Sequence, residues 1–282
     1  MNKMKKLLII FFIISSITFG QQIQKAKSLD GNEIAFTVQG KGELALIFVH
    51  GWACNKSYWK NQTKEFAKNY KVVALDLIGH GQSTANRKSY TMQLFGQDVA
   101  AVVNQLKLSK VILIGHSMAG AVILEAKKIL KDKVIGIIGV DTYQVLDVGE
   151  TEERAEQFLS TFKSNYLGSV EAYLGNLFTE GRDTSFTNSI IRDLQKMPKE
   201  RGIDIFRNIL KYNYEKAVRE TNPKIIAVNS DRFPVKLEKV KKIIPSFEFK
   251  IVPNTDHFLM LENPTEFNNK LNEAIKELLK TN

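Results

Sequence analysis

Cysteine is nearly absent from this sequence: Cys54 is the only one among 282 residues. A single cysteine excludes an intramolecular disulfide and a cysteine-based metal cluster. No neighbouring residue would activate the Cys54 thiol, so we do not expect it to be a nucleophile. The folded chain must therefore draw its stability from its core.

Blocks of like charge are also absent. No run of five or more like charges occurs, and basic and aromatic residues do not interleave as a nucleic-acid groove would require. The formal charge of +10 falls to +7 without residues 1–20, which hold three lysines and no acid. This moderate positive charge is typical of a solvated surface, and it leaves open a mild preference for anionic surfaces. We expect no nucleic-acid partner.

An apolar run stands at the N-terminus, where Leu7–Ile14 follow three lysines and small residues precede Gln21. The run is too short to span a bilayer, and its flanks are typical of a secretory signal peptide. We therefore predict a signal peptide at residues 1–20 and export to the periplasm or the cell exterior. A retained membrane anchor is the alternative.

The remaining chain, with 44% hydrophobic and 25% charged residues overall, alternates short β-branched runs with amphipathic stretches. This pattern predicts an α/β fold, a mostly parallel sheet with helices on both faces. The predicted strands are Glu33–Val38, Leu44–Val49, Lys71–Asp76, Lys110–Gly115, Val134–Val140, Lys224–Asn229 and Glu248–Val252. The predicted helices are Lys56–Asn69, Met92–Leu106, Ala119–Leu130, Lys236–Ile244 and Pro264–Leu279.

The alternation breaks after the strand ending at Val140, where helical periodicity continues to Thr221 without a convincing strand. An insertion of this length predicts a helical cap at 142–221 on a core formed by 21–141 and 222–282. Aromatic and aliphatic side chains recur at helical spacing in the cap, in one stripe at Phe158, Phe162 and Tyr166 and another at Tyr173, Leu174, Leu177 and Phe178. We expect these stripes to attach the cap to the core, with direct ligand contact as the alternative.

Histidine is scarce as well, with four in the chain, and this scarcity bears on Ser117 in "GHSMAG". A serine nucleophile needs a general base. His116 should point away from the adjacent serine, whereas His50 and His80 sit in turns that they are better suited to brace. His257 follows the last predicted strand and is the base that elimination leaves.

A carboxylate should orient such a base. Asp231 follows the predicted strand Lys224–Asn229 and is the preferred candidate, and Asp141, after Val134–Val140, is the alternative. Asp256 and Asp76 are expected to brace loops. Because ligands bind at the carboxyl ends of strands in open α/β sheets, the placement of Ser117, Asp231 and His257 favours one shared site.

Three motifs, "VHGWACNKSYW", "LDLIGHGQS" and "IGHSMAG", together with the order of serine, acid and histidine, resemble the α/β-hydrolase superfamily, in its capped serine esterase and cofactor-free haloperoxidase-like branch. The resemblance covers about residues 30 to 280. It implies Ser117 as nucleophile, Asp231 as acid and His257 as base, with an oxyanion hole from the backbone N–H groups of Trp52 and Met118. Substrate-pocket candidates are Trp52, Tyr143 and Phe258.

One position departs from the family's usual Gly-x-Ser-x-Gly elbow: Ala119 takes the place of the second glycine, and Gly120 follows it. We expect a serine hydrolase that cleaves a carboxylic ester, lactone or related acyl substrate, with no metal or organic cofactor. A carbon–carbon bond hydrolase or perhydrolase with the same triad is one alternative, and a ligand-binding receptor on the same fold is another.

Overall fold

The computed structural model describes residues 22–280, so the predicted signal peptide lies outside the described residues. An eight-stranded sheet forms the centre, in the order β1-β2-β4-β3-β5-β6-β7-β8. β1 and β2 run antiparallel to their neighbours, and all other pairs are parallel. The strands are β1 (Ile23–Lys27), β2 (Glu33–Gln39), β3 (Leu44–Val49), β4 (Lys71–Leu75), β5 (Lys110–His116), β6 (Val134–Val140), β7 (Ile225–Ser230) and β8 (Glu248–Val252).

The predicted α/β fold is confirmed, with one strand that the sequence pattern missed. β1 reads "IQKAK" and buries one residue of five, so it lacks the apolar pattern that marks the inner strands. By contrast, β3 to β7 are buried almost throughout, as strands covered on both faces must be.

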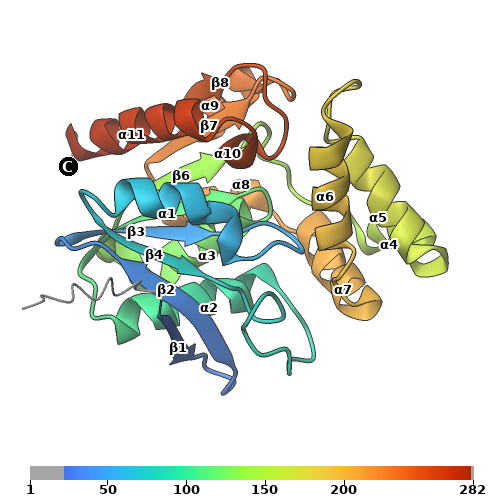
Figure 1. Ribbon diagram of the computed structural model, residues 1–282, viewed down its shortest axis with the longest axis horizontal. Helices are drawn as coiled ribbons and strands as arrows, with labels where there is room; N and C mark the ends of the chain where they lie inside the picture. The colour runs from blue at the N-terminus through green and yellow to red at the C-terminus, as the bar shows by residue number, and fades with distance from the viewer. Residues whose placement is uncertain (1–21, 281–282) are drawn as a thin grey trace, which may run out of the picture.

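Helices cover both faces of the sheet (Figure 1). They are η1 (Lys56–Trp59), α1 (Lys60–Phe66), α2 (Met92–Gln105), α3 (Ala119–Leu130), η2 (Lys131–Lys133), α9 (Leu237–Ile243), α10 (Leu259–Glu262) and α11 (Pro264–Lys280). None of the helices within residues 22–280 combines the length and apolarity that a bilayer span requires.

Five helices and no strand lie between β6 and β7: α4 (Glu152–Ser164), α5 (Tyr166–Gly175), α6 (Thr184–Leu194), α7 (Lys199–Leu210) and α8 (Tyr214–Thr221). Figure 1 shows α4 to α7 beside the sheet as a separate group, which we call the cap helices. α8 instead packs against α3 of the core. Just before α8, the Tyr212 hydroxyl donates to a Glu125 carboxylate oxygen on α3 at 2.8 Å.

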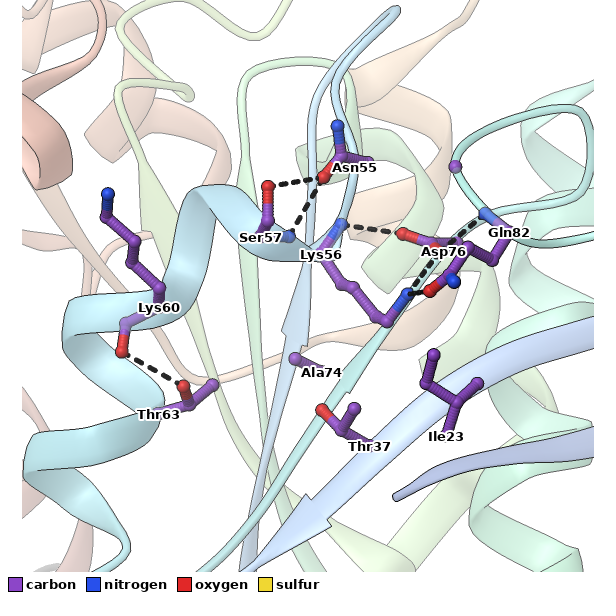
Figure 2. A pocket seen from close by; sticks show the side chains of 11 residues that line it. Ile23, Thr37, Asn55, Lys56, Ser57, Lys60, Thr63, Ala74, Asp76 and Gln82 are labelled. Atoms are coloured by element: carbon purple, nitrogen blue, oxygen red, sulfur yellow. Dashed lines mark hydrogen bonds and ion pairs between the residues drawn. The ribbon is translucent and has the colours of Figure 1, made fainter. Parts of the chain in front are cut away.

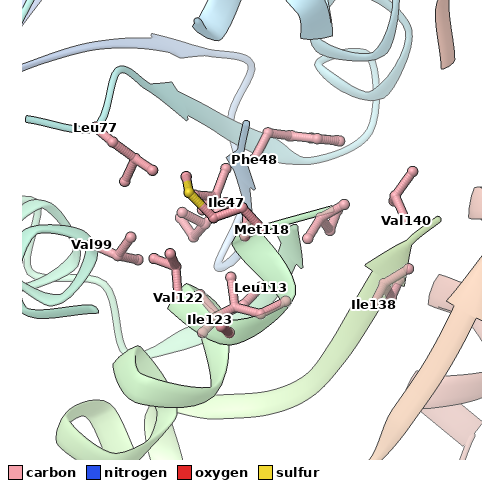
Figure 3. Packing of buried hydrophobic residues seen from close by; sticks show 14 of the residues in the cluster. Ile47, Phe48, Leu77, Val99, Leu113, Met118, Val122, Ile123, Ile138 and Val140 are labelled. Carbon is pink, nitrogen blue, oxygen red and sulfur yellow. The ribbon is translucent and has the colours of Figure 1, made fainter. Parts of the chain in front are cut away.

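The core sits between the central strands and α3. Figure 3 shows Ile47 of β3 and Leu113 of β5, which are register partners, beside Met118, Val122 and Ile123 at the start of α3. All five are buried. This packing holds the strands against α3, and it therefore positions the loops that follow the strands.

Candidate active site

Ser117 occupies a strained turn between β5 and α3. Its φ is +55°, a left-handed conformation that costs a residue other than glycine about 1–3 kcal/mol. The Ser117 N–H donates to the Val140 carbonyl at 2.9 Å, and the Ser117 carbonyl accepts from the Gly120 N–H at 2.9 Å. These bonds hold the serine at the apex of a strand–turn–helix elbow.

Close packing explains the glycines that flank this elbow. A Cβ at Gly115 would lie 2.7 Å from the Ala119 carbonyl oxygen, and a Cβ at Gly120 would lie 2.6 Å from Thr142 Oγ1. Ala119 itself is buried in the core and fits there. The second glycine that the elbow requires is therefore Gly120, one position later than in the usual motif.

His257 stands beside the elbow with a carboxylate behind it. Its Nδ1 lies 2.6 Å from Oδ2 of Asp141, which is completely buried. Since a carboxylate only accepts, Nδ1 carries the proton, which leaves Nε2 as the basic nitrogen. Ser117 and His257 line one cavity.

The structure corrects the choice of acid. Asp231, the predicted partner of His257, is exposed and accepts the backbone N–H groups of Asn254 at 2.9 Å and Thr255 at 3.3 Å. It braces the loop before His257 and does not contact the imidazole. Asp141, the alternative, takes the acid position.

Strand register explains this outcome. β6 pairs directly with β5, with Val140 opposite His116, so Asp141 and Ser117 follow paired residues of neighbouring strands. Asp231 follows β7, one strand further away. The end of β7 instead supplies Ser230, whose N–H and Oγ–H donate to Oδ1 of Asp141 at 3.0 and 2.8 Å.

Asp141 is ionised in spite of its burial. Burial alone would raise the pKa of this carboxyl group, but the hydrogen bonds from His257 and Ser230 outweigh that effect and hold its pKa below the usual value. A buried carboxylate with this stabilisation is suited to fix the imidazole's orientation and to balance a positive charge on it.

His116 braces the base from the other side. Its Nε2–H donates to the His257 carbonyl at 2.8 Å, and the two rings lie 4.7 Å apart. Burial is the main cause that lowers the pKa of His116 to about 3, so this ring stays neutral. His116 was expected to point away from the Ser117 side chain; it also lines the cavity at Ser117, where it holds His257.

The turn after β3 passes over the elbow. A Cβ at Gly51 would lie 3.0 Å from His116 Nδ1 and 3.3 Å from Ser117 Cβ, so a side chain here would crowd both residues. His50 fixes the turn, since its Nε2 accepts the Leu77 N–H at 3.0 Å. In the part of the chain that the structure describes, the N–H groups of Trp52 and Met118 have no protein acceptor. Both remain available to a ligand oxygen near Ser117.

The cavity at Ser117 is small, and both polar and apolar side chains line it. It encloses about 20 Å³, room for about one water molecule. Besides Ser117 and the two histidines, it is lined by Gly51, Trp52, Cys54, Tyr173, Leu174, Leu177, Leu194 and Phe258. A substrate must therefore displace side chains or shift the cap helices when it enters.

This lining tests the predicted pocket residues. Trp52 and Phe258 face the cavity as predicted. Tyr143 does not: it is buried, and its hydroxyl donates to the Gly120 carbonyl at 2.7 Å, so it holds α3. Tyr143 comes just after the turn at Asp141 and has a φ of +65°, and this backbone conformation directs its side chain inward.

The two aromatic stripes of the cap make different contacts. Tyr173, Leu174 and Leu177 were expected to attach the cap, with direct ligand contact as the alternative, and they line the cavity. In the other stripe, Phe162 packs against Phe206 of α7 with ring centroids 5.4 Å apart, which is a contact inside the cap and not with the core. The sequence gives no indication that Leu194 and Cys54 line the cavity, because an apolar residue that lines a cavity has the same sequence pattern as a core residue.

The remaining acidic candidates brace loops, as expected. Asp76 is buried and accepts from the Lys56 N–H at 2.7 Å, the Lys56 Nζ at 2.6 Å and the Gln82 N–H at 2.9 Å, as can be followed in Figure 2. It borders a separate cavity of about 490 Å³, which Ser117 does not line. Asp256 binds Thr179 and Arg182 of the cap.

Comparison with known proteins agrees with this architecture. The model of the alpha/beta hydrolase family matches residues 46–270. The chain belongs to this family. The resemblance drawn from the three motifs is thereby confirmed.

Individual relatives are more distant. A pimeloyl-(acyl-carrier protein) methyl ester esterase of Wigglesworthia glossinidia brevipalpis is 25% identical over 81% of this chain and 92% of its own length. A putative esterase/lipase of Haemophilus influenzae is 34% identical over 41% of this chain and 40% of its own length. Several other curated relatives match over less than half of their length, down to 29%.

Solved structures share the fold. A thermophilic esterase from Thermogutta terrifontis superposes with a TM-score of 0.78 at 21% identity, covering 91% of this chain and 99% of the esterase. A bromoperoxidase from Bacillus anthracis gives a TM-score of 0.76 at 20% identity, covering 92% and 100%. At this identity the likeness concerns the architecture of the sheet and cap.

Proposed function

We propose that the protein is a serine hydrolase that cleaves a carboxylic ester, lactone or related acyl substrate through an acyl-enzyme. The observation that carries this proposal is the 2.6 Å contact from His257 Nδ1 to buried Asp141, beside a serine held at an elbow. Ser117 is the nucleophile, His257 the general base and Asp141 the acid. The family's esterases support the choice of an ester.

The reaction begins when Ser117 Oγ attacks the carbonyl carbon of the substrate. The hydroxyl proton passes to His257 Nε2, and the imidazolium that forms is balanced by Asp141. The N–H groups of Trp52 and Met118 receive the negative charge that develops on the carbonyl oxygen, a contribution of about 3–4 kcal/mol for each donor.

Collapse of this intermediate breaks the bond to the alcohol, which leaves with the proton from His257. Water then gives a proton to His257 and attacks the acyl-enzyme, and Ser117 recovers its proton as the acid departs. No step requires a metal or organic cofactor.

The test combines labelling with turnover. A fluorophosphonate probe should label Ser117, and Ser117→Ala should abolish labelling and hydrolysis of p-nitrophenyl butyrate. Ser160→Ala, which removes an exposed hydroxyl on α4, is the matched control and should leave both unchanged. Unchanged hydrolysis in the Ser117→Ala variant would refute the assignment, and an unlabelled Ser117 would favour a ligand-binding role.

We further propose export, because residues 1–20 combine three lysines with a short apolar run. The partner is then a small acyl compound outside the cytoplasm. N-terminal sequencing of protein recovered from the periplasm or medium should begin near Gln21, and a chain recovered there that still begins at Met1 would contradict cleavage.

A further inference from the structure

A second cleft lies at the seam between the core and the cap helices. It encloses about 260 Å³ and has a polar lining that includes Asn55, His80, Asp193, Lys196 and Arg201. The core contributes the turns after β3 and β4, and the cap contributes the end of α6 and the start of α7. Unlike the cavity at Ser117, this cleft has room for part of a small molecule.

The cleft and the cavity at Ser117 are neighbours, with the Cys54 side chain between them. Cys54 lines both spaces, and it is buried between them. Burial raises the pKa of its thiol, so Cys54 stays neutral and acts as a small apolar partition. A substrate that reaches Ser117 past Cys54 would leave its outer portion in the polar cleft.

Arg201 supplies the charge in this cleft. It is half-buried at the start of α7, and one guanidinium N–H donates to the Gly79 carbonyl at 2.8 Å. The guanidinium also lies 5.8 Å from the centre of the Tyr90 ring. None of the ion pairs within residues 22–280 involves Arg201, so its N–H donors, one of which binds the Gly79 carbonyl, have no anionic partner there.

The other charges in the cleft cancel. Lys196 pairs with Asp193 at 2.9 Å, and Asp193 also accepts from the Tyr58 hydroxyl at 2.8 Å. His80 is buried, and burial is the main cause that lowers its pKa well below the usual value, so its ring is neutral. The lining therefore carries one net positive charge, located on Arg201.

We propose that the seam cleft binds a carboxylate on the part of the substrate remote from the scissile ester, with Arg201 as the specificity-determining residue. An arginine presents paired N–H donors that match the two oxygens of a carboxylate. The substrate class is then a half-ester of a dicarboxylic acid or an ester of similar anionic form. This inference rests on the proposed ester hydrolysis for its placement of the scissile bond.

Binding to an inactive variant tests the cleft separately from turnover. In the Ser117→Ala background, calorimetry would compare monomethyl glutarate with methyl valerate, a neutral ester of similar size. Arg201→Gln should weaken binding of monomethyl glutarate about ten- to hundredfold and leave methyl valerate within about twofold. Arg201→Lys, which keeps the charge, should retain part of the preference for the anion.

Arg192→Gln is the matched control, because Arg192 is an exposed cation in the last turn of α6 that does not line the cleft. It should leave both affinities unchanged. Equal losses for Arg192→Gln and Arg201→Gln, equal losses for both ligands, or no binding of monomethyl glutarate at millimolar concentration would each overturn the proposal. A failure of Ser117 labelling would instead refute the proposed function and leave this binding measurement valid.

Discussion

The core and the cap helices meet at Ser117, but each contributes by a different means. In the core, backbone geometry places the polar groups: Ser117 and Asp141, which directly follow β5 and β6, both have positive φ. The cap helices add side chains to the cavity, among them Tyr173, Leu174 and Leu194. The difference indicates that the core determines the reaction, whereas the cap determines what is admitted.

The two regions are also held differently. The core is held by a hydrogen-bonded sheet with buried apolar side chains on it. The seam to the cap combines ring contacts, such as Phe178 stacked on Phe258 with centroids 5.7 Å apart, with individual polar contacts. Examples of the polar contacts are the Trp52 indole N–H to the Gly202 carbonyl at 3.1 Å and Arg182 to Asp256 at 2.7 Å. These polar contacts can be exchanged for water more readily than core packing, which suits a cavity that must open.

The largest expected effect separates the two acidic candidates of the core. Asp141→Asn should lower kcat/KM for p-nitrophenyl butyrate about a thousand- to ten-thousandfold, because the neutral amide cannot balance the imidazolium. Asp231→Asn is the matched control and should change it by less than about threefold, since Asp231 is exposed and contacts only backbone N–H groups. Steady-state kinetics measure kcat/KM for both variants. A larger loss of kcat/KM in Asp231→Asn than in Asp141→Asn would reverse the assignment of the acid.

The next effect is acid destabilisation of the core. His50, His80 and His116 are buried, and burial is the main cause that lowers the pKa of each, in the case of His116 to about 3. Below pH 6.5 the unfolded chain binds protons that these folded rings do not, so stability falls as the pH drops. Asp98 opposes this fall in part, because burial raises its pKa to about 6, so the folded protein binds a proton there that the unfolded chain does not.

Unfolding should take up protons between pH 6 and 5, so the free energy of unfolding should fall over this range, by up to about 1.4 kcal/mol for each histidine that stays neutral in the folded protein. Urea denaturation followed by tryptophan fluorescence at both pH values measures this fall. His80→Asn should make the fall smaller, whatever its effect on stability at pH 7. A free energy of unfolding that is level from pH 6 to 5 would be incompatible with neutral buried histidines.

The smallest effect concerns the attachment of the cap. Arg182→Gln leaves the buried Asp256 without its ion-pair partner, and we expect the free energy of local opening around Thr179 to fall by about 1–3 kcal/mol. Hydrogen exchange should accelerate in α5 and α6 and stay unchanged in β5. Arg192→Gln again serves as the control, and acceleration spread evenly over cap and sheet would show that the two regions are not held separately.

Much of the site was predictable because it depends on short-range chemistry. Ser117 follows a buried strand in a motif with two close-packed glycines, and His257 was the histidine left after the others were assigned to turns. The acid was not predictable in the same way. Asp141 and Asp231 both follow apolar strands, and only the strand order reveals which of those strands lies next to β5.

The sequence by itself determined the alternation of strands and helices, the elbow at Ser117 and the base, because these follow from hydrophobic period, turn chemistry and the scarcity of histidine. Tertiary structure decided the partner of His257, the inward turn of Tyr143, the small cavity at Ser117 and, within residues 22–280, the placement of Arg201 in the seam cleft without a carboxylate partner. Each of those depends on which segments distant in the chain come into contact, and side-chain patterns along one segment do not encode the identity of its neighbours.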